Sequence, residues 1–275
     1  MSTDSKSKAT RTRAKAKPAG AASAPALAPE DCGLKLFLQP IYMPAAHEVF
    51  GYECLLRIVD MELGTLSPGV FLDVAEKSPE LLVKMENWAI EEICDMQEKM
   101  ASGSKPDPAM LSLNISSAHF FSPDFLPTVK RITKNTKAHL PSICLEFKEE
   151  VLFEQKDYVE KTFAALRELG LKIAIDDFGI EFFSVFRDSV PAIDIVKIDR
   201  SYTSNFLTNS KSATIVRAVI DYAKENNLQV VAVGVEKEDQ QNGLLELGCG
   251  KMQGYLYSKP LVKAKPIRKR TTKNK

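Results

Sequence analysis

Short apolar runs recur along most of the chain and are separated by longer amphipathic stretches. Runs of four to seven residues rich in Val, Ile, Leu and Phe are typical of buried strands. We predict strands at 35–41, 51–56, 111–116, 143–147, 172–176, 194–198 and 229–233, and a weaker one near 252–257.

Apolar side chains at helical spacing lie between several of these strands. Val159, Phe163 and Leu166 stand at positions i, i+4 and i+7, the same spacing recurs over 215–222, and the longest predicted helix covers 79–99. Strands that alternate with helices indicate an α/β fold with a mostly parallel sheet covered by helices. Eight strands in this length fit a single-domain TIM (β/α)8 barrel. A doubly wound open sheet is the alternative, although no glycine-rich phosphate loop follows any strand.

The two ends of the chain differ from its middle in charge. Residues 1–30 contain six Lys or Arg and two acidic residues, whereas residues 261–275 contain seven Lys or Arg and no acidic residue. The whole chain carries a net charge of +1, so the segment between the ends carries −10. The ends also contain few large apolar side chains. We therefore expect disordered basic tails at 1–32 and 263–275 and one barrel domain at 33–262.

The cysteines and the longest apolar runs bear on the cellular compartment. Five scattered cysteines form no CxxC pair, which excludes a thiolate zinc site and a disulfide scaffold and suits a reducing compartment. No apolar run approaches the roughly 20 residues that a transmembrane helix needs. The basic N-terminus lacks the apolar region of a secretory signal. We expect a cytoplasmic protein.

Polar side chains stand at or just beyond the carboxyl ends of successive predicted strands. They are Glu53, Asn114, Glu146, Asp176 with Asp177, Lys197, Glu236 and Gln253. Each alone would suit an ordinary turn, but in a barrel these positions converge on one rim, where such folds carry their chemistry. Carboxylates brought together in this way repel each other unless a cation lies among them. Oxygen ligands favour Mg²⁺ or Mn²⁺, and a pair of such ions suits in-line attack on a phosphodiester.

Several short motifs follow the order and spacing of one known family. They are Leu38-Gln39-Pro40-Ile41, Glu53-Cys54-Leu55-Leu56-Arg57, Ser67-Pro68 to Phe71, Ala75-Glu76, Leu113-Asn114-Ile115-Ser116, Glu146-Phe147-Lys148-Glu149, Asp176-Asp177-Phe178-Gly179, Lys197-Ile198-Asp199-Arg200 and Gln253-Gly254-Tyr255. On these residues the chain resembles the EAL domain family, the bacterial cyclic di-GMP phosphodiesterases, across roughly 34–262. The resemblance implies a modified TIM barrel.

The resemblance also implies a role for each matching residue. The implied metal ligands are Glu53, Asn114, Glu146 and Asp176 for a first ion, and Asp177 on the side of a second. The implied catalytic residues are Lys197, which contacts the nucleophilic water, and Glu236, which matches the second glutamate of the family's Ala-Glu-Gly-Val-Glu motif. The implied substrate-binding residues are Gln39, Arg57 and Gln253, and Glu149 matches the acid that steadies the loop after the Asp pair. The implied cofactor is Mg²⁺ or Mn²⁺.

Two departures from the family pattern bear on activity. Val233 stands where the family has the glutamate credited with activating water beside the second metal, and valine can neither ligate an ion nor accept a proton. Residues 180–184 read Ile-Glu-Phe-Phe-Ser in place of the family's Thr-Gly-Tyr-Ser-Ser, and Lys148 replaces a nearby threonine. That loop couples metal binding to dimerisation in the family. We therefore expect a weakened homodimer at most.

These observations lead to one preferred function and two alternatives. We expect an EAL-type cyclic di-GMP signalling protein with weak or no phosphodiesterase activity that acts as a nucleotide receptor or binds a protein partner. The first alternative is an active Mg²⁺- or Mn²⁺-dependent phosphodiesterase that produces the linear dinucleotide. The second is a scaffold that its basic tails hold on nucleic acid or on an anionic membrane. The replacement at Val233 leaves open whether the chain is an enzyme.

Overall fold

The computed structural model describes residues 33–60, 64–66, 78–102, 109–179 and 192–262. Several of the sequence predictions lie outside these residues. They are the two disordered tails at 1–32 and 263–275, Cys32, the motifs within 67–76, and the altered loop at 180–184.

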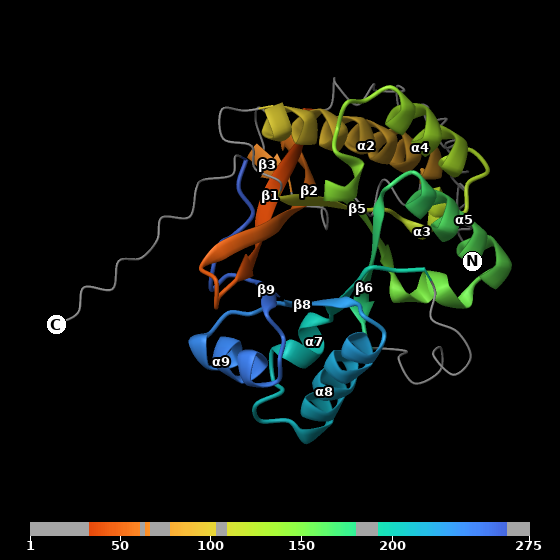
Figure 1. Ribbon diagram of the computed structural model, residues 1–275. Coiled ribbons are helices and arrows are strands. Elements are labelled where there is room, and N and C mark those ends of the chain that lie inside the picture. The colour runs from red at the N-terminus through yellow and green to blue at the C-terminus, as the bar shows by residue number, and fades with distance from the viewer. Residues whose placement is uncertain (1–32, 61–63, 67–77, 103–108, 180–191, 263–275) are drawn as a thin grey trace, which may run out of the picture.

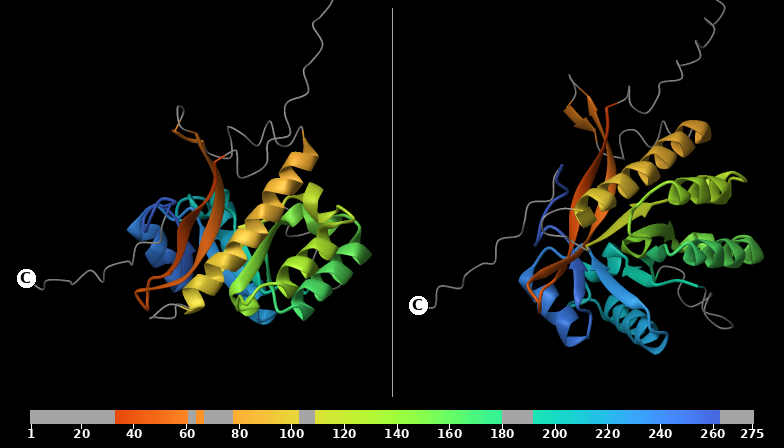
Figure 2. Two further views of the ribbon diagram at one scale, coloured as in Figure 1. Left: turned by 90° about the horizontal axis from the view of Figure 1, so that it is seen from above. Right: turned by 45° about the horizontal axis from the view of Figure 1, so that its top comes forward.

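Eight strands close into a barrel, as the sequence predicts (Figure 1). Around the ring they are β1 (Leu34–Met43), β9 (Lys251–Gln253), β8 (Gln229–Val233), β7 (Ile195–Ile198), β6 (Lys172–Phe178), β5 (Ile143–Lys148), β4 (Met110–Asn114) and β2 (Glu48–Asp60). Pairing between β1 and β2 closes the ring, and a short β3 (Gly64–Leu66) lies at one end of the long β1–β2 hairpin (Figure 2). The TIM-like barrel is therefore confirmed.

Strand β1 is the modification in this barrel. It runs antiparallel to both of its neighbours, whereas the other seven strands of the ring pair in parallel with one another. Only residues 44–47 separate β1 from β2, and a parallel crossover needs a dozen or more residues. The turn includes His47 at a φ of 54°, a left-handed conformation typical of tight hairpins. The alternation of strands with helices that we predicted therefore begins only after β2, and the sheet is mostly parallel, as expected.

The two seams of β1 differ in extent. Ten residue pairs join β1 to β2. On its other edge, β1 meets β9 at one register pair, Tyr42 and Met252, and a bridge between Leu38 and Leu261 continues that edge. The barrel therefore closes through a much shorter ladder on the β9 side.

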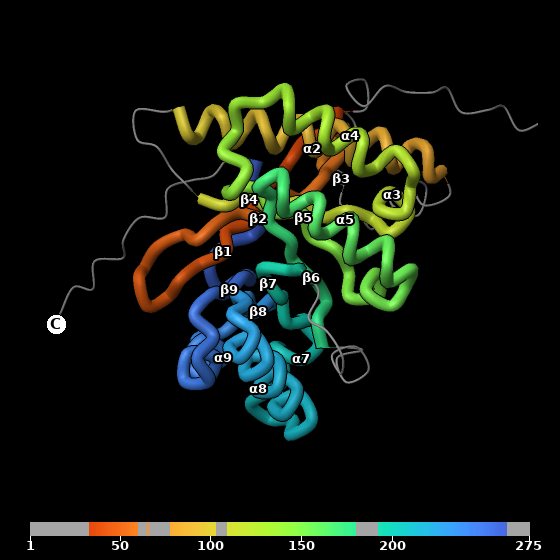
Figure 3. Tube along the Cα trace, turned by 45° about the vertical axis from the view of Figure 1, so that its right-hand side comes forward, coloured from red at the N-terminus to blue at the C-terminus, as the bar shows by residue number. Residues whose placement is uncertain are grey.

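Helices cover the outside of the barrel (Figures 1 and 2). They are α2 (Pro79–Ser102), α3 (Ser117–Phe120), α4 (Phe125–Lys134), α5 (Lys156–Glu168), α7 (Arg200–Thr203), α8 (Ser210–Glu225) and α9 (Glu238–Glu246), with the short 3₁₀ helices η2 (Leu140–Ser142) and η3 (Glu149–Phe153). The predicted helices at 79–99, around 159–166 and at 215–222 correspond to α2, α5 and α8. Helices α2 and α4 pack beside each other along one side (Figure 3). Across the described ranges, each helix is too short or too polar to span a bilayer.

The main core lies between the outer face of the sheet and these helices. Phe120 is completely buried at its centre. Its ring lies 4.9–5.5 Å, centroid to centroid, from those of Phe121, Phe125, Phe147, Tyr158 and Phe163. Helices α3, α4 and α5 are thereby joined to β5 through one aromatic cluster.

Alternate residues of each strand face the barrel interior, where an apolar layer lies below a polar one. The apolar layer consists of the buried residues Ile41, Met110, Cys144, Ala174, Ile195 and Val231. Two positions further along β5, β6 and β7, the same face carries Glu146, Asp176 and Lys197. The barrel is thus filled by side chains, with its charged groups at the carboxyl ends of the strands.

The four cysteines in the described part of the chain are all buried and free of disulfides. Burial raises the pKa of Cys94 and Cys249 to about 11 and holds the pKa of Cys54 and Cys144 well above the ordinary value. These thiols act as small apolar side chains of the core.

The aromatic cluster yields a test of this core. Phe120→Ala should lower the free energy of unfolding by about 3–5 kcal/mol, because it removes a fully buried ring and leaves a cavity. Phe153→Ala, at a ring that is 44% exposed, should change it by no more than about 0.5 kcal/mol. Urea denaturation of the two variants measures the difference. Similar small losses in both would contradict the assigned core.

Candidate functional site

A buried lysine lies at the centre of the polar layer. Lys197 on β7 is 1% exposed, and its Nζ lies 3.1 Å from Glu53 Oε2, 2.5 Å from Glu146 Oε2 and 3.3 Å from Asp176 Oδ1. Burial alone would lower the pKa of this ammonium, but Asp176, Glu146 and Glu53 outweigh burial and raise the pKa well above its usual value. Three carboxyl groups from β2, β5 and β6 therefore surround one positive charge.

Two side-chain amides extend this arrangement through Glu53. Gln253 Nε2 donates to Glu53 Oε2 at 2.6 Å, and Asn114 Nδ2 donates to Glu53 Oε1 at 2.7 Å. Gln253 Nε2 also lies 3.3 Å from Gln39 Oε1. Burial raises the pKa of Glu53, but Lys197 and the two amides outweigh burial and leave that pKa below its usual value.

The structure thus brings seven of the predicted site residues into one polar network. Its members are Gln39, Glu53, Asn114, Glu146, Asp176, Lys197 and Gln253. They come from seven of the eight strands in the ring, β1, β2, β4, β5, β6, β7 and β9. Strand β8 contributes none.

Glu146 is the most deeply buried carboxylate of this network, at 1% exposure. Burial raises its pKa to about 8; Lys197 opposes burial, whereas Glu53 and Asp176 add to the rise. The folded chain therefore binds a proton at this residue over a range in which the unfolded chain does not.

A pH-dependent stability follows from that raised pKa. The free energy of unfolding should increase as the pH falls from about 8 toward 4.5, because Glu146 keeps its proton in the folded state and releases it on unfolding. Glu146→Gln has no such proton, so this part of the pH dependence should disappear. Urea denaturation at a series of pH values measures it, with the exposed Glu154→Gln as the matched control. A Glu146→Gln profile as steep as that of the wild type would contradict the assignment.

The adjacent acids Asp176 and Asp177 lie at a distortion of β6. The register between β6 and β7 shifts between Ile175 and Phe178, and Asp177 has a φ of 54°. This left-handed conformation is uncommon outside glycine, although aspartate tolerates it better than most residues. Asp176 contacts Lys197, whereas Asp177 lies beside the network, next to Asp199.

Asp177 lies instead among other negative charges. Burial raises its pKa to about 6, and Asp176 and Asp199 add to the rise. Lys148 is the group that opposes it. The surroundings of Asp177 therefore favour an additional positive charge.

Arg57, a predicted substrate-binding residue, also lies outside the network. Its Nη1 donates to the Leu56 carbonyl at 2.7 Å, and its guanidinium carbon lies 6.0 Å from the centre of the Phe37 ring. Partial burial lowers the pKa of Arg57, and the nearby Glu53 opposes that shift. The charged group is thus held close to the network without contacting it.

The end of β8 interrupts the polar layer. Val233 is in register with Gln253 and packs against the apolar layer of the barrel interior. Glu236, three residues further on, is exposed, and its Oε1 accepts a hydrogen bond from Arg200 Nη2 at 2.7 Å. Glu149 is buried at the beginning of η3. The carboxylate of Glu236 therefore points away from the network, toward Arg200.

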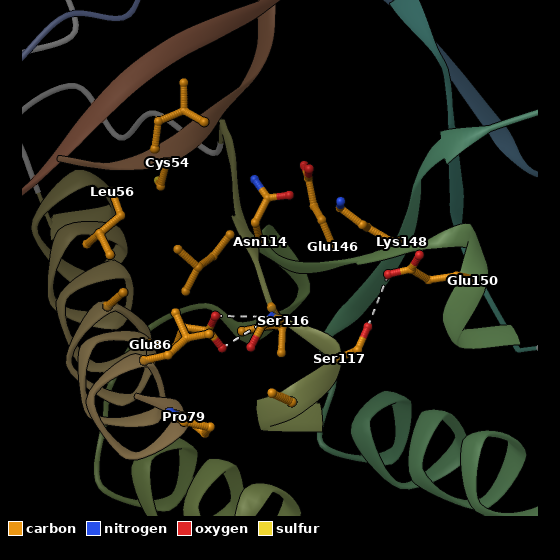
Figure 4. A pocket seen from close by; sticks show the side chains of 16 residues that line it. Cys54, Leu56, Pro79, Glu86, Asn114, Ser116, Ser117, Glu146, Lys148 and Glu150 are labelled. Atoms are coloured by element: carbon orange, nitrogen blue, oxygen red, sulfur yellow. Dashed lines mark hydrogen bonds between the residues drawn. The ribbon is translucent and has the colours of Figure 1, made fainter. Parts of the chain in front are cut away.

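A cavity of about 460 Å³ adjoins the network (Figure 4). Its walls come from the ends of β2, β4 and β5 and from α2 and α3. Asn114, Glu146, Lys148 and Glu150 line its polar part, while apolar side chains such as Leu82 line the rest. Small-molecule sites typically measure about 300–1,000 Å³ and combine apolar walls with a few polar groups.

The sequence reasoning missed two residues beside this cavity. Glu86 on α2 accepts from the backbone N–H of Ser116 at 3.1 and 3.2 Å and lies 2.9 Å from His119 Nδ1. The side chains of Glu86 and His119 are both buried, and together they hold the turn that follows Asn114. The sequence offered one signal for Glu86, because this acidic residue occupies a position of α2 that the apolar pattern places on the buried face.

The oxygen atoms of the network are of the type that a hard divalent cation prefers as ligands. Three carboxylates and the amide oxygen of Asn114 form the all-oxygen set that Mg²⁺ or Mn²⁺ prefers. Across the described ranges, no three His, Cys, Asp or Glu side chains are grouped as a metal centre. The space between Glu53, Glu146 and Asp176 holds the Lys197 ammonium instead. An ion at these ligands would therefore require a shift of Lys197 or of the carboxylates.

The fold and the site together define a class of protein. It is a modified TIM barrel with one antiparallel strand, which gathers carboxylates, amides and a lysine at the carboxyl ends of its strands. Residues 24–260 match the EAL domain family. The chain therefore belongs to the EAL domain family, which comprises cyclic di-GMP signalling proteins and phosphodiesterases.

Similar proteins and structures agree with this assignment. The chain is 33% identical over 228 residues to the signaling protein YkoW of Bacillus subtilis and 31% identical over 229 residues to the bifunctional diguanylate cyclase/cyclic di-GMP phosphodiesterase MucR of Pseudomonas aeruginosa. These matches cover 82% and 83% of this chain but 28% and 33% of the relatives. A solved structure described as "PaMucR Phosphodiesterase, c-di-GMP complex" superimposes with a TM-score of 0.77 at 29% identity, covering 85% of this chain and 94% of that one.

Proposed function

We propose that this chain is a cyclic di-GMP receptor that keeps the nucleotide pocket of its family and hydrolyses the nucleotide weakly or not at all. The observation that carries the proposal is Val233. It ends β8 on the inner face of the barrel, in register with Gln253, at the position where the family has the glutamate that activates water.

Hydrolysis needs a group that accepts a proton from the attacking water. The isopropyl side chain of Val233 has no such group, and it packs against apolar neighbours. Glu236 lies nearest to it along the chain among the acids that follow β8, but its carboxylate is paired with Arg200. Loss of a general base reduces the rate by about 10²–10⁴-fold. We therefore attribute to this site little capacity for turnover.

The groups suited to nucleotide recognition are present. Gln39 and Gln253 adjoin each other at the β1–β9 seam, and Arg57 carries a planar guanidinium able to donate two parallel hydrogen bonds to a phosphate. None of these three residues is needed to activate water. The similar structure of MucR is described as a complex with cyclic di-GMP, which supports the same ligand class for the polar end of this barrel.

Phosphodiesterases of this family depend on divalent metal ions. Glu53, Asn114, Glu146 and Asp176 would hold such an ion here, which would neutralise charge on a bound phosphate. We propose Mg²⁺ or Mn²⁺, because hard ions of this kind suit oxygen ligands. Lys197 would then be freed to contact the phosphate or the water beside it.

An active phosphodiesterase is the second candidate, and the intact oxygen ligand set with Lys197 favours it. Incubation of the purified protein with cyclic di-GMP and Mg²⁺ or Mn²⁺, followed by chromatography of the linear dinucleotide, separates the two candidates. Turnover comparable with that of MucR under the same conditions would reject the receptor proposal.

Restoring the missing carboxylate should increase hydrolysis. Val233→Glu is expected to raise the rate of linear dinucleotide formation by about 10²-fold, because a general base typically supplies at least that factor. Val262→Glu adds the same charge at a side chain that is 57% exposed and should leave the rate unchanged. If Val233→Glu has no effect, the altered residues at 180–184 become the stronger explanation for low activity.

Nucleotide binding without turnover is tested by calorimetry in the presence of Ca²⁺, which occupies oxygen sites. The wild type should bind cyclic di-GMP, and Arg57→Ala should weaken binding by about 1.5–3 kcal/mol, the usual contribution of a hydrogen bond to a charged group. Arg131→Ala, at an exposed ion pair on α4, is the matched control. If the wild type shows no binding up to high micromolar nucleotide, the receptor proposal fails and a regulator that binds a protein partner takes its place.

A further inference from the structure

Lys148 is a positively charged residue beside the polar network whose carboxylates pair with Lys197 instead. It ends β5 two positions beyond Glu146, so the alternation of the strand places both on the inner face. Figure 4 shows its side chain directed toward Glu146 and Asn114 along the cavity. Its side chain is exposed, and within the described ranges no carboxylate lies within ion-pairing distance of it.

The neighbours of Lys148 leave its ammonium available. Glu150, on the same wall of the cavity, lies within 3.5 Å of the Ser117 hydroxyl instead. Lys148 is in register with Asp176, whose carboxylate turns to Lys197. Lys148 also opposes the rise in the pKa of Asp177, so its charge acts on the part of the site where acids crowd together.

The two altered inner-face positions have a combined effect on charge. Relative to the family pattern, valine at 233 removes one negative charge and lysine at 148 adds one positive charge. The site is thereby more positive by two elementary charges. This equals the charge of one divalent ion, and Asp177 belongs to the side on which the family places its second ion.

We infer that the Lys148 ammonium takes the place of the second divalent ion and donates to a phosphate oxygen of bound cyclic di-GMP. A lysine binds phosphate as a point charge, without the fixed geometry that a bridging ion imposes on an attacking water. Nucleotide binding then does not depend on a second ion. This inference rests on the proposed receptor function.

Binding measured with and without divalent ions tests the inference. Calorimetry with cyclic di-GMP in EDTA and in Ca²⁺ should give wild-type dissociation constants within about tenfold of each other. Lys148→Thr, which restores the family's residue, should weaken binding in EDTA by about tenfold or more, the value of one charge-assisted hydrogen bond. Lys148→Arg keeps the charge and should retain most of the affinity. Lys130→Thr, at an exposed lysine of α4, should bind like the wild type.

A double variant tests the converse, that restoring the family's charges restores the dependence of binding on divalent ions. Lys148→Thr/Val233→Glu restores the charge of the family pattern, so it should bind cyclic di-GMP well in Ca²⁺ and poorly in EDTA. A titration with Mn²⁺ in the presence of nucleotide, followed by electron paramagnetic resonance, should count one more bound ion in this variant than in the wild type.

The outcomes separate this inference from the function on which it rests. If Lys148→Thr binds as the wild type does in EDTA, or if the wild type loses binding in EDTA and one equivalent of Mn²⁺, enough to fill the first ion site only, does not restore it, the receptor proposal stands and the role of Lys148 is rejected. If the wild type binds in neither condition, both are rejected.

Discussion

One buried ammonium that contacts three carboxyl groups constrains the whole interior of this barrel. A lysine that is 1% exposed is tolerated only when opposite charges surround it, and removal of a partner from such a group is strongly destabilising. Glu53, Glu146 and Asp176 meet that need from three different strands. Because Glu53 also accepts from amides on β4 and β9, the strand ends cannot move independently of this charge.

Much of the fold could be predicted because the strands are apolar runs whose last inward residue is polar. Glu146 and Asp176 mark their strand ends in this way. The direction of β1 was not predicted, since it depends on a four-residue turn rather than on the strand pattern. The sequence also did not reveal which of the predicted site residues lie outside the network. Glu236 and Gln253 were both predicted at the rim, but the β8 strand ends three residues before Glu236, and Arg200 holds that carboxylate elsewhere.

The function that we propose depends on very few inner-face positions. The outer face of the sheet packs against the surrounding helices in the same way whether the protein is a hydrolase or a receptor. On the inner face, one side chain decides whether a water beside the phosphate can lose its proton, and others decide only whether the phosphate is held. In the receptor function that we propose, Val233 belongs to the first kind and Arg57 to the second. Catalysis can therefore be lost from such a site while the shape that recognises the nucleotide persists.

The short seam between β1 and β9 has a mechanical consequence. Tyr42 and Met252 form its one register pair, and reciprocal hydrogen bonds between Leu38 and Leu261 continue it. Few hydrogen bonds must break for the ring to part there, so amide hydrogens along this seam should exchange with solvent sooner than those of the parallel strands. Gln39 and Gln253 lie on its two sides. A force applied to the chain beyond Leu261 would therefore act first on the Gln39–Gln253 contact. It would then act on Lys197 through the hydrogen bond from Gln253 to Glu53.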